Sequence, residues 1–192
     1  MNSRERVMTA LALKQPDRVP FMDFVDTAVK HQIMGPGDID EAELARKIGM
    51  DAIYFLDYAL PAFCENPSGP SEGSVAGGLS GETEFIGEGL IRTEADLPKI
   101  VLPDPKGEGF YEPAKRFLEK YHDSDLALYA GMRPFGMFNT IYSMPMMDFA
   151  VALRDNRKLI DAMMDMFVEW NLAVIEKIQT LGFDFIAGYN DM

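Results

Sequence analysis

The amino-acid sequence predicts an α/β fold of one domain over residues 1–192, in the form of a partial (β/α)8 TIM barrel with about four parallel strands. Short apolar runs alternate with amphipathic segments of helix length, an order that produces parallel strands joined by crossover helices. A complete (β/α)8 domain needs about 250 residues, more than the 192 residues of this chain. The alternative is a small open α/β sandwich. Two features argue against the sandwich. No helix follows the final predicted strand, and no glycine-rich loop follows the first strand.

The N-terminal part of the chain predicts a helix, a strand and a second helix. Ser3 can cap the first helix, and Pro16 ends it. Residues 18–24 follow as the first strand. Asp40 can cap the next helix, and Gly49 is suited to the left-handed conformation at its end.

The other predicted strands are continuous apolar runs, as expected of strands that are buried on both faces of a parallel sheet. They are residues 52–56, 126–130 and 183–187. A hairpin insertion is predicted near residues 83–93, after a stretch rich in Gly, Pro and Ser, and a helix at residues 111–121. Ser143 and Asn156 each begin a further helix, and Gly182 ends the second of these.

The composition excludes several classes of partner. The net charge is −13, which repels phosphate backbones and anionic lipid, so we expect no nucleic-acid and no membrane partner. No apolar run is long enough to span a bilayer. Cys64 is the single cysteine and cannot form an internal disulfide, which is typical of a reducing compartment. We therefore expect a cytoplasmic protein.

Polar side chains follow each predicted strand. They are Asp23 and Asp26 after the first, Asp57 and Tyr58 after the second, Arg133 after the third, and Tyr189, Asn190 and Asp191 after the fourth. Active sites of barrels lie at the carboxyl ends of the strands. These residues are therefore predicted to surround one opening with acceptors and a single cation, suited to a polar ligand or to proton transfer.

Several short motifs follow one another in the order found in a known superfamily. They are Arg4-Glu5-Arg6-Val7, Pro16-Asp17-Arg18-Val19-Pro20-Phe21, Phe55-Leu56-Asp57, the run from Thr93 to Pro105, Pro134-Phe135, Gly182-Phe183-Asp184 and Asn190-Asp191. Together they resemble the uroporphyrinogen decarboxylase-like superfamily, which includes tetrapyrrole decarboxylases and cobalamin-dependent methyltransferases. The resemblance covers essentially the whole chain and implies the N-terminal half of a (β/α)8 barrel.

The resemblance also implies roles for individual residues. Asp57 would be the catalytic carboxylate, which faces the pyrrole nitrogens and stabilises charge that develops on the ring. Arg133 would contact an anion, and Tyr142 or Thr140 would supply a hydroxyl after the Pro-Phe motif. The substrate-binding set would be completed by the other polar residues at the strand ends, which are Asp23, Asp26, Tyr58, Asn190 and Asp191.

The chain differs from uroporphyrinogen decarboxylases where these enzymes hold the many carboxylates of their substrate. Residues 22–31 contain no arginine and two aspartates, so the charge-assisted pairs that select a polyanion are missing. The methyltransferase branch binds zinc through a His-x-Cys and a later Cys, which would lie beyond Met192. His31, His122 and Cys64 do not have the spacing of metal ligands, and no metal site is predicted within the chain.

We therefore expect the intact protein to be a corrinoid-linked methyltransferase or a related tetrapyrrole-handling enzyme, with a corrinoid or zinc as its cofactor and a corrinoid protein as a partner. Porphyrin biosynthesis by uroporphyrinogen decarboxylation is one alternative. The other is a non-catalytic half-barrel that binds a partner chain. Because a half-barrel has open strand edges, we also expect self-association or a C-terminal half that covers them.

Overall fold

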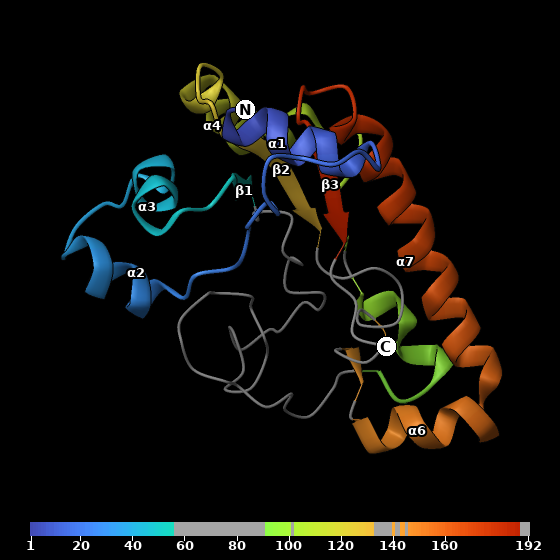
Figure 1. The fold of residues 1–192 in the computed structure, drawn as a ribbon. Helices are drawn as coiled ribbons and strands as arrows, with labels where there is room; N and C mark the ends of the chain where they lie inside the picture. Colours follow the sequence, from blue (N-terminus) through green and yellow to red (C-terminus); the bar gives the residue numbers. More distant parts are fainter. Residues whose placement is uncertain (56–90, 101, 133–139, 141–142, 145, 189–192) are drawn as a thin grey trace.

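The computed structural model describes residues 1–55, 91–100, 102–132, 140, 143–144 and 146–188 (Figure 1). Its helices are α1 (Ser3–Leu11), α2 (Thr27–Met34), α3 (Glu41–Ile48), the 3-10 helix η1 (Glu94–Lys99), α4 (Glu108–Tyr121), α6 (Met146–Asp155) and α7 (Arg157–Ile178). Its strands are β1 (Ala52–Phe55), β2 (Ala127–Met132) and β3 (Phe185–Gly188).

The three strands form one parallel sheet in the order β1-β2-β3. Ala52 lies opposite Ala127 in the first pair of strands, and Tyr129 lies opposite Phe185 in the second. Since all three strands run in the same direction, their amino ends share one edge of the sheet and their carboxyl ends share the other (Figure 1).

The predicted fold class is wrong for the residues that the structure describes, because they contain three parallel strands in one sheet and not a four-stranded partial (β/α)8 barrel. The predicted first strand, residues 18–24, is neither helix nor strand. Among the described residues, one backbone hydrogen bond joins this segment to the residue before β1. It runs from Asp51 N–H to the Phe21 carbonyl, at 2.7 Å. Val19 is 83% exposed and Phe21 44% exposed, so this segment lacks the two-sided burial that stabilises a parallel strand.

Several local predictions are confirmed. Asp40 caps α3 by accepting from Ala42 N–H and Glu43 N–H, both at 3.0 Å. Gly49 ends that helix in the left-handed conformation, with a φ of 81°. Asn156 caps α7. The first helix is capped by Asn2 and not by Ser3, because the side chain of Asn2 accepts from Glu5 N–H.

The structure contains one helix, α2, that the sequence did not predict, and it leaves most of the predicted hairpin untested. The sequence pattern did not indicate α2, which Asp26 caps by accepting from Ala28 N–H. Residues 83–90 of the predicted hairpin lie outside the described residues, and its last residues lead into η1.

Helices α4 and α7 cover one face of the sheet. Phe55, Ala130 and Ile186 project from the three strands on that face and pack against these helices in one apolar cluster. The helix residues of the cluster are Tyr111 and Ala114 of α4 and Trp170, Val174 and Ile178 of α7. The amino-terminal half of α7 packs instead on α6, through a second apolar cluster that contains Met163 and Phe167.

Candidate functional site

The sequence predicts the functional residues at the carboxyl edge of the sheet. The last residues of the three strands are Phe55, Met132 and Gly188, and parallel pairing brings these strand ends to one edge. The predicted residues that follow them lie outside the described residues: Asp57, Tyr58, Arg133, Tyr142, Asn190 and Asp191. Their roles stay predictions.

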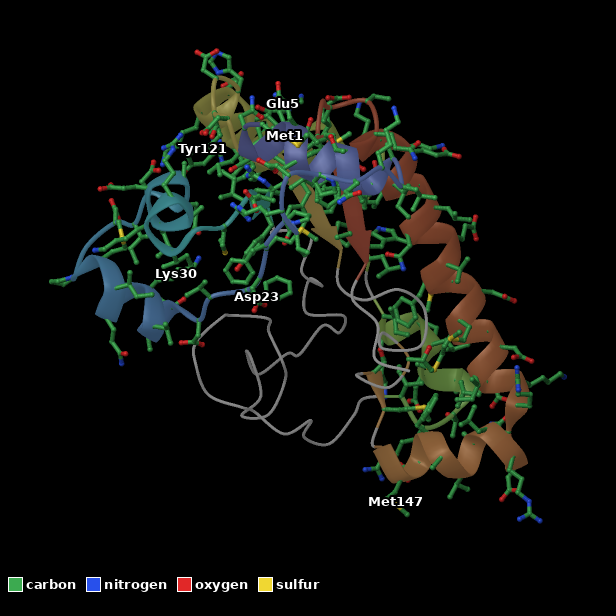
Figure 2. All side chains as sticks on the ribbon, in the orientation of Figure 1. Met1, Glu5, Asp23, Lys30, Tyr121 and Met147 are labelled. Atoms are coloured by element: carbon green, nitrogen blue, oxygen red, sulfur yellow. The ribbon has the colours of Figure 1, made fainter. Side chains whose placement is uncertain are left out.

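Thr140, the alternative to Tyr142, is described by the structure and is fully buried. Asp23 and Asp26 are the other two predicted site residues that the structure describes. They lie on the segment that leads into α2, where Figure 2 labels Asp23. The Asp23 carboxylate accepts from the next backbone N–H, that of Phe24, at 2.7 Å. Asp26 is the cap of α2. Both carboxylates therefore have local structural roles, and neither follows a strand.

A row of aromatic side chains crosses the sheet on the face opposite α4 and α7. Tyr54, Tyr129 and Phe185 occupy the same level on the three strands, as the register shows. The rings of Tyr129 and Phe185 are stacked, with centroids 4.8 Å apart and planes 10° apart. Tyr54 lies 5.8 Å from Tyr129, and Phe24 contacts Tyr54 edge-on at 4.8 Å. We call Phe24, Tyr54, Tyr129 and Phe185 the aromatic row.

Small side chains border the aromatic row along the strands. Ala52 and Ala127 precede it, and Gly131 and Ala187 follow it toward the carboxyl edge on the same face. Val7 of α1 belongs to the apolar cluster on this face. Tyr129 is 1% exposed, whereas the rings of Tyr54 and Phe185 on the two outer strands are half-buried. The outer rings are therefore the parts of the aromatic row that a ligand can reach.

Lys30 is a cation beside the aromatic row. It lies on α2 (Figure 2) and is 8% exposed, and its Nζ is 5.7 Å from the centre of the Tyr54 ring. The same Nζ donates to Glu41 Oε1 at 2.6 Å. A carboxylate and a ring face thus share the buried ammonium group, an arrangement that offsets its desolvation.

The amino edge of the sheet holds a buried ionic cluster. Asp51, whose side chain is fully buried, accepts from Arg6 Nη1 at 2.6 Å and from Arg18 Nη1 at 2.7 Å. Asp17 accepts from Arg6 Nε at 2.6 Å. Further along the same edge, Arg4 Nη2 donates to Asp184 Oδ1 at 2.6 Å. This cluster fixes α1 across the amino ends of the strands.

The cluster also changes the acidity of its carboxyl groups. A hydrogen bond from Arg6 lowers the pKa of Asp17 to about 2. Burial raises the pKa of Asp51, but hydrogen bonds from Phe21 N–H, Ser3, Arg18 and Arg6 outweigh that effect and lower it overall. Both groups are therefore charged at neutral pH and serve as fixed anions.

Within the described part of the chain, no group of His, Cys, Asp and Glu has the arrangement of a metal site. The helices that the structure describes include none that is long and apolar enough to cross a membrane. Comparison of the chain with models of protein families, with curated proteins and with solved structures finds no match. The candidate site therefore rests on the geometry and the chemistry of its own residues.

Sequence reasoning missed the aromatic row and Lys30. The signal for the row is weak but present: Ala-x-Tyr occurs in both β1 and β2, and Phe-x-Ala occurs in β3. Period-2 spacing places each pair on one face of its strand. The register that aligns the three strands is not visible in the sequence. Lys30 gave no signal, because α2 itself was not predicted.

Proposed function

We propose that this chain belongs to an enzyme of the uroporphyrinogen decarboxylase-like superfamily that handles a corrinoid or another tetrapyrrole, in the first place a corrinoid-linked methyltransferase. The sequence motifs support the choice of superfamily. The aromatic row is the single structural observation that carries the choice of ligand.

The orientation of the rings suits a large flat ligand. Tyr129 and Phe185 stack at 4.8 Å, which equals the usual spacing between strands, about 4.8 Å. Their planes therefore stand upright on the sheet and their edges face away from it. Ring edges carry partial positive charge and attract the electron-rich face of another π-system. A macrocycle beside the row would make edge-to-face contacts with its half-buried rings, those of Phe24, Tyr54 and Phe185, while Tyr129 supports them from within.

The charges near the row support a corrinoid over uroporphyrinogen. A substrate with many carboxylates needs several unpaired cations. Lys30 is the cation that contacts the row in the described part of the chain, and Glu41 already pairs with it. Asp57 as the central carboxylate and Arg133 as an anion contact are parts of the same proposal.

The cofactor, partner and location are proposals of the same kind. A corrinoid, or zinc held by residues outside this chain, would supply the methyl-transfer chemistry, and a corrinoid protein would be the partner. The net charge of −13 supports a partner other than nucleic acid. The single cysteine supports a cytoplasmic location.

Binding of macrocycles tests the proposal. The full chain is titrated with hydroxocobalamin and, separately, with uroporphyrin, and the visible absorbance is followed. We expect hydroxocobalamin to bind and Tyr54→Leu to weaken binding about fivefold, since an aromatic contact is worth about 1 kcal/mol. Phe117→Leu is the matched control, because Phe117 packs on the opposite face of the sheet. Binding of neither macrocycle, or equal weakening by both variants, would refute the proposal. Uroporphyrin binding alone would favour a decarboxylase.

The role of Asp57 needs a separate measurement. Turnover of the intact enzyme with Asp57→Ala should fall strongly if this carboxylate stabilises the reacting ring. Activity close to that of the wild type would remove Asp57 from the mechanism and leave the macrocycle proposal standing.

A second candidate function is binding of a partner chain without catalysis. The observation in its favour is that β1 and β3 are the outer strands of the described sheet, and each pairs with one neighbouring strand. Exposed strand edges are templates for pairing with another chain. Sedimentation at increasing protein concentration distinguishes this function: association without any macrocycle binding supports it, and a monomer that binds a macrocycle contradicts it.

A further inference from the structure

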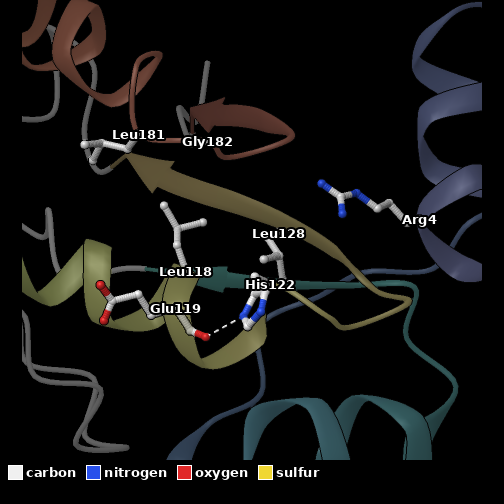
Figure 3. Close-up of a pocket in the computed structure, with 7 residues that line it drawn as sticks. All are labelled: Arg4, Leu118, Glu119, His122, Leu128, Leu181 and Gly182. Carbon is white, nitrogen blue, oxygen red and sulfur yellow. Dashed lines mark hydrogen bonds between the residues drawn. The ribbon is translucent and has the colours of Figure 1, made fainter.

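A pocket of about 430 Å³ lies at the amino edge of the sheet, the edge opposite the proposed macrocycle site (Figure 3). It is formed where the end of α4 and the turn between α7 and β3 approach α1. Pockets for small ligands have volumes of roughly 300–1,000 Å³. Its size therefore suits a small molecule.

Three leucines give the pocket an apolar wall. Leu118 comes from α4, Leu128 from β2 and Leu181 from the turn after α7 (Figure 3). They come from three separate parts of the chain, so the wall exists only in the folded protein. A ligand that buries apolar surface against this wall would be stabilised by the hydrophobic effect.

Arg4 brings unused hydrogen-bond donors to this wall. Its Nε and Nη2 donate to Asp184 Oδ1 at 2.8 and 2.6 Å. Asp184 Oδ2 accepts from Leu128 N–H at 2.8 Å, so this carboxylate is itself well bonded and holds the guanidinium in place. A guanidinium has five N–H donors. Among the described residues no partner is found for the two N–H groups on Arg4 Nη1.

Two backbone carbonyls around the pocket already accept hydrogen bonds. The Glu119 carbonyl accepts from His122 Nδ1 at 2.7 Å. At the end of α7, the Ile178 carbonyl accepts from Leu181 N–H at 3.0 Å. The Glu119 carboxylate points away from Arg4 and His122 (Figure 3). The pocket thus offers donors next to an apolar wall, and its ligand must bring acceptors.

We propose that this pocket binds a small carboxylate with an apolar tail, of the class of medium-chain fatty acids. The carboxylate accepts from Arg4, and a carboxylate matches the planar fork of a guanidinium better than other anions of its size. The tail lies against the leucines. The site is independent of the proposed macrocycle function, because the two lie at opposite edges of the sheet.

Binding of octanoate tests this proposal. Octanoate is titrated into the full chain while leucine methyl signals are followed by NMR, with 1-octanol and octylamine as probes of the same length. We expect octanoate to shift methyl signals of the three leucines and to bind about tenfold more tightly than either other probe, as a charge-assisted hydrogen bond allows. Equal binding of all three probes, or shifts elsewhere in the protein, would overturn the proposal.

Two variants locate the site. Arg4→Met should weaken octanoate binding about tenfold and leave 1-octanol binding unchanged. Because this variant also removes the ion pair with Asp184, Leu118→Trp serves as a second test that keeps Arg4. Its larger ring fills the pocket from the apolar side and should abolish binding of octanoate. Undiminished octanoate binding by Leu118→Trp would show that the ligand binds somewhere else.

Discussion

Asp51 is the residue on which the N-terminal segment depends most. Its fully buried carboxylate accepts from two arginines and from the Phe21 N–H, and its own N–H donates to the Phe21 carbonyl. One aspartate at the start of β1 therefore holds both α1 and the segment after it. A buried carboxylate is tolerated here because each oxygen accepts more than one hydrogen bond.

Asp51→Asn should lower the free energy of unfolding by about 3 kcal/mol, because Arg6 and Arg18 lose the buried carboxylate that they share and Arg6 keeps only Asp17. Urea denaturation measures this change. Asp125→Asn is the matched control: Asp125 pairs with Arg46 at the surface, where both side chains are 54% exposed, and should cost less than about 0.5 kcal/mol. Similar losses in the two variants would contradict the role given to Asp51.

The same cluster predicts a loss of stability in acid. The folded pKa of Asp17 is about 2 and that of Asp51 is lowered, whereas an unfolded aspartate titrates near about 3.9. Their contribution is therefore complete above pH of about 4 and is lost as the pH falls toward about 2. Unfolding free energies between these pH values should show a steeper fall in the wild type than in Asp17→Asn. If the free energy of unfolding fell equally steeply with pH in both proteins, the prediction would be wrong.

At the scale of elements, α7 links two apolar clusters. Its carboxyl-terminal half packs on the sheet through Trp170, Val174 and Ile178, and its amino-terminal half packs on α6 and η1 through residues such as Met163 and Phe167. Trp170 also donates from Nε1 to the Pro103 carbonyl at 2.7 Å. Helix α7 extends beyond the carboxyl ends of the strands, and α6 therefore lies on that side of the sheet (Figure 1).

The end of α3 gives a local test of helix capping. Gly49 has a φ of 81° and no atom near the position of an added Cβ, so Gly49→Ala adds backbone strain without a clash. We expect a loss of about 1 kcal/mol in the free energy of unfolding. Gly109→Ala is the control, because its added Cβ also meets open space but its φ is not positive. A neutral Gly49→Ala variant would contradict the left-handed cap.

At the scale of the whole molecule, α1 connects the two outer strands. Arg6 pairs with Asp51 just before β1, and Arg4 pairs with Asp184 just before β3. The second pair joins residues 180 positions apart in the chain. Val7, the residue after Arg6, is 3% exposed and packs in the cluster with Tyr129. The first helix therefore fastens the sheet across its whole width.

Arg4→Met should loosen α1 and the amino end of β3 without unfolding α7. Hydrogen exchange detected by mass spectrometry should show about tenfold faster exchange in these two segments and unchanged exchange in α7, because the lost contacts are local to the amino edge. Arg157→Met is the control, since its pair with Asp161 is exposed and lies within one helix. Faster exchange over the whole chain would contradict this view of α1.

Much of the helical structure follows from the sequence, because caps and apolar periodicity act over a few residues. Asp40, Gly49 and Asn156 mark helix ends where the structure has them, whereas α7 ends at Ile178 and not at Gly182. The apolar run at residues 52–56 contains β1, and the other two runs overlap β2 and β3, which extend further toward the carboxyl end. Residues 18–24 also have strand-like composition. Whether such a segment joins a sheet depends on burial by distant residues, and here the Asp51 side chain takes the Phe21 N–H instead of a strand carbonyl.

In the candidate site, too, some features follow from the sequence and others depend on the tertiary structure. Residue types, charge and the motifs that suggest a superfamily are properties of the sequence alone. Only the tertiary structure decided that Tyr54, Tyr129 and Phe185 form one row, since the strand register aligns them across long separations in the chain. It likewise decided that Arg4 pairs with Asp184 and lines one pocket together with three leucines. Such contacts depend on how the whole chain packs, and packing between distant segments leaves little trace in local sequence patterns.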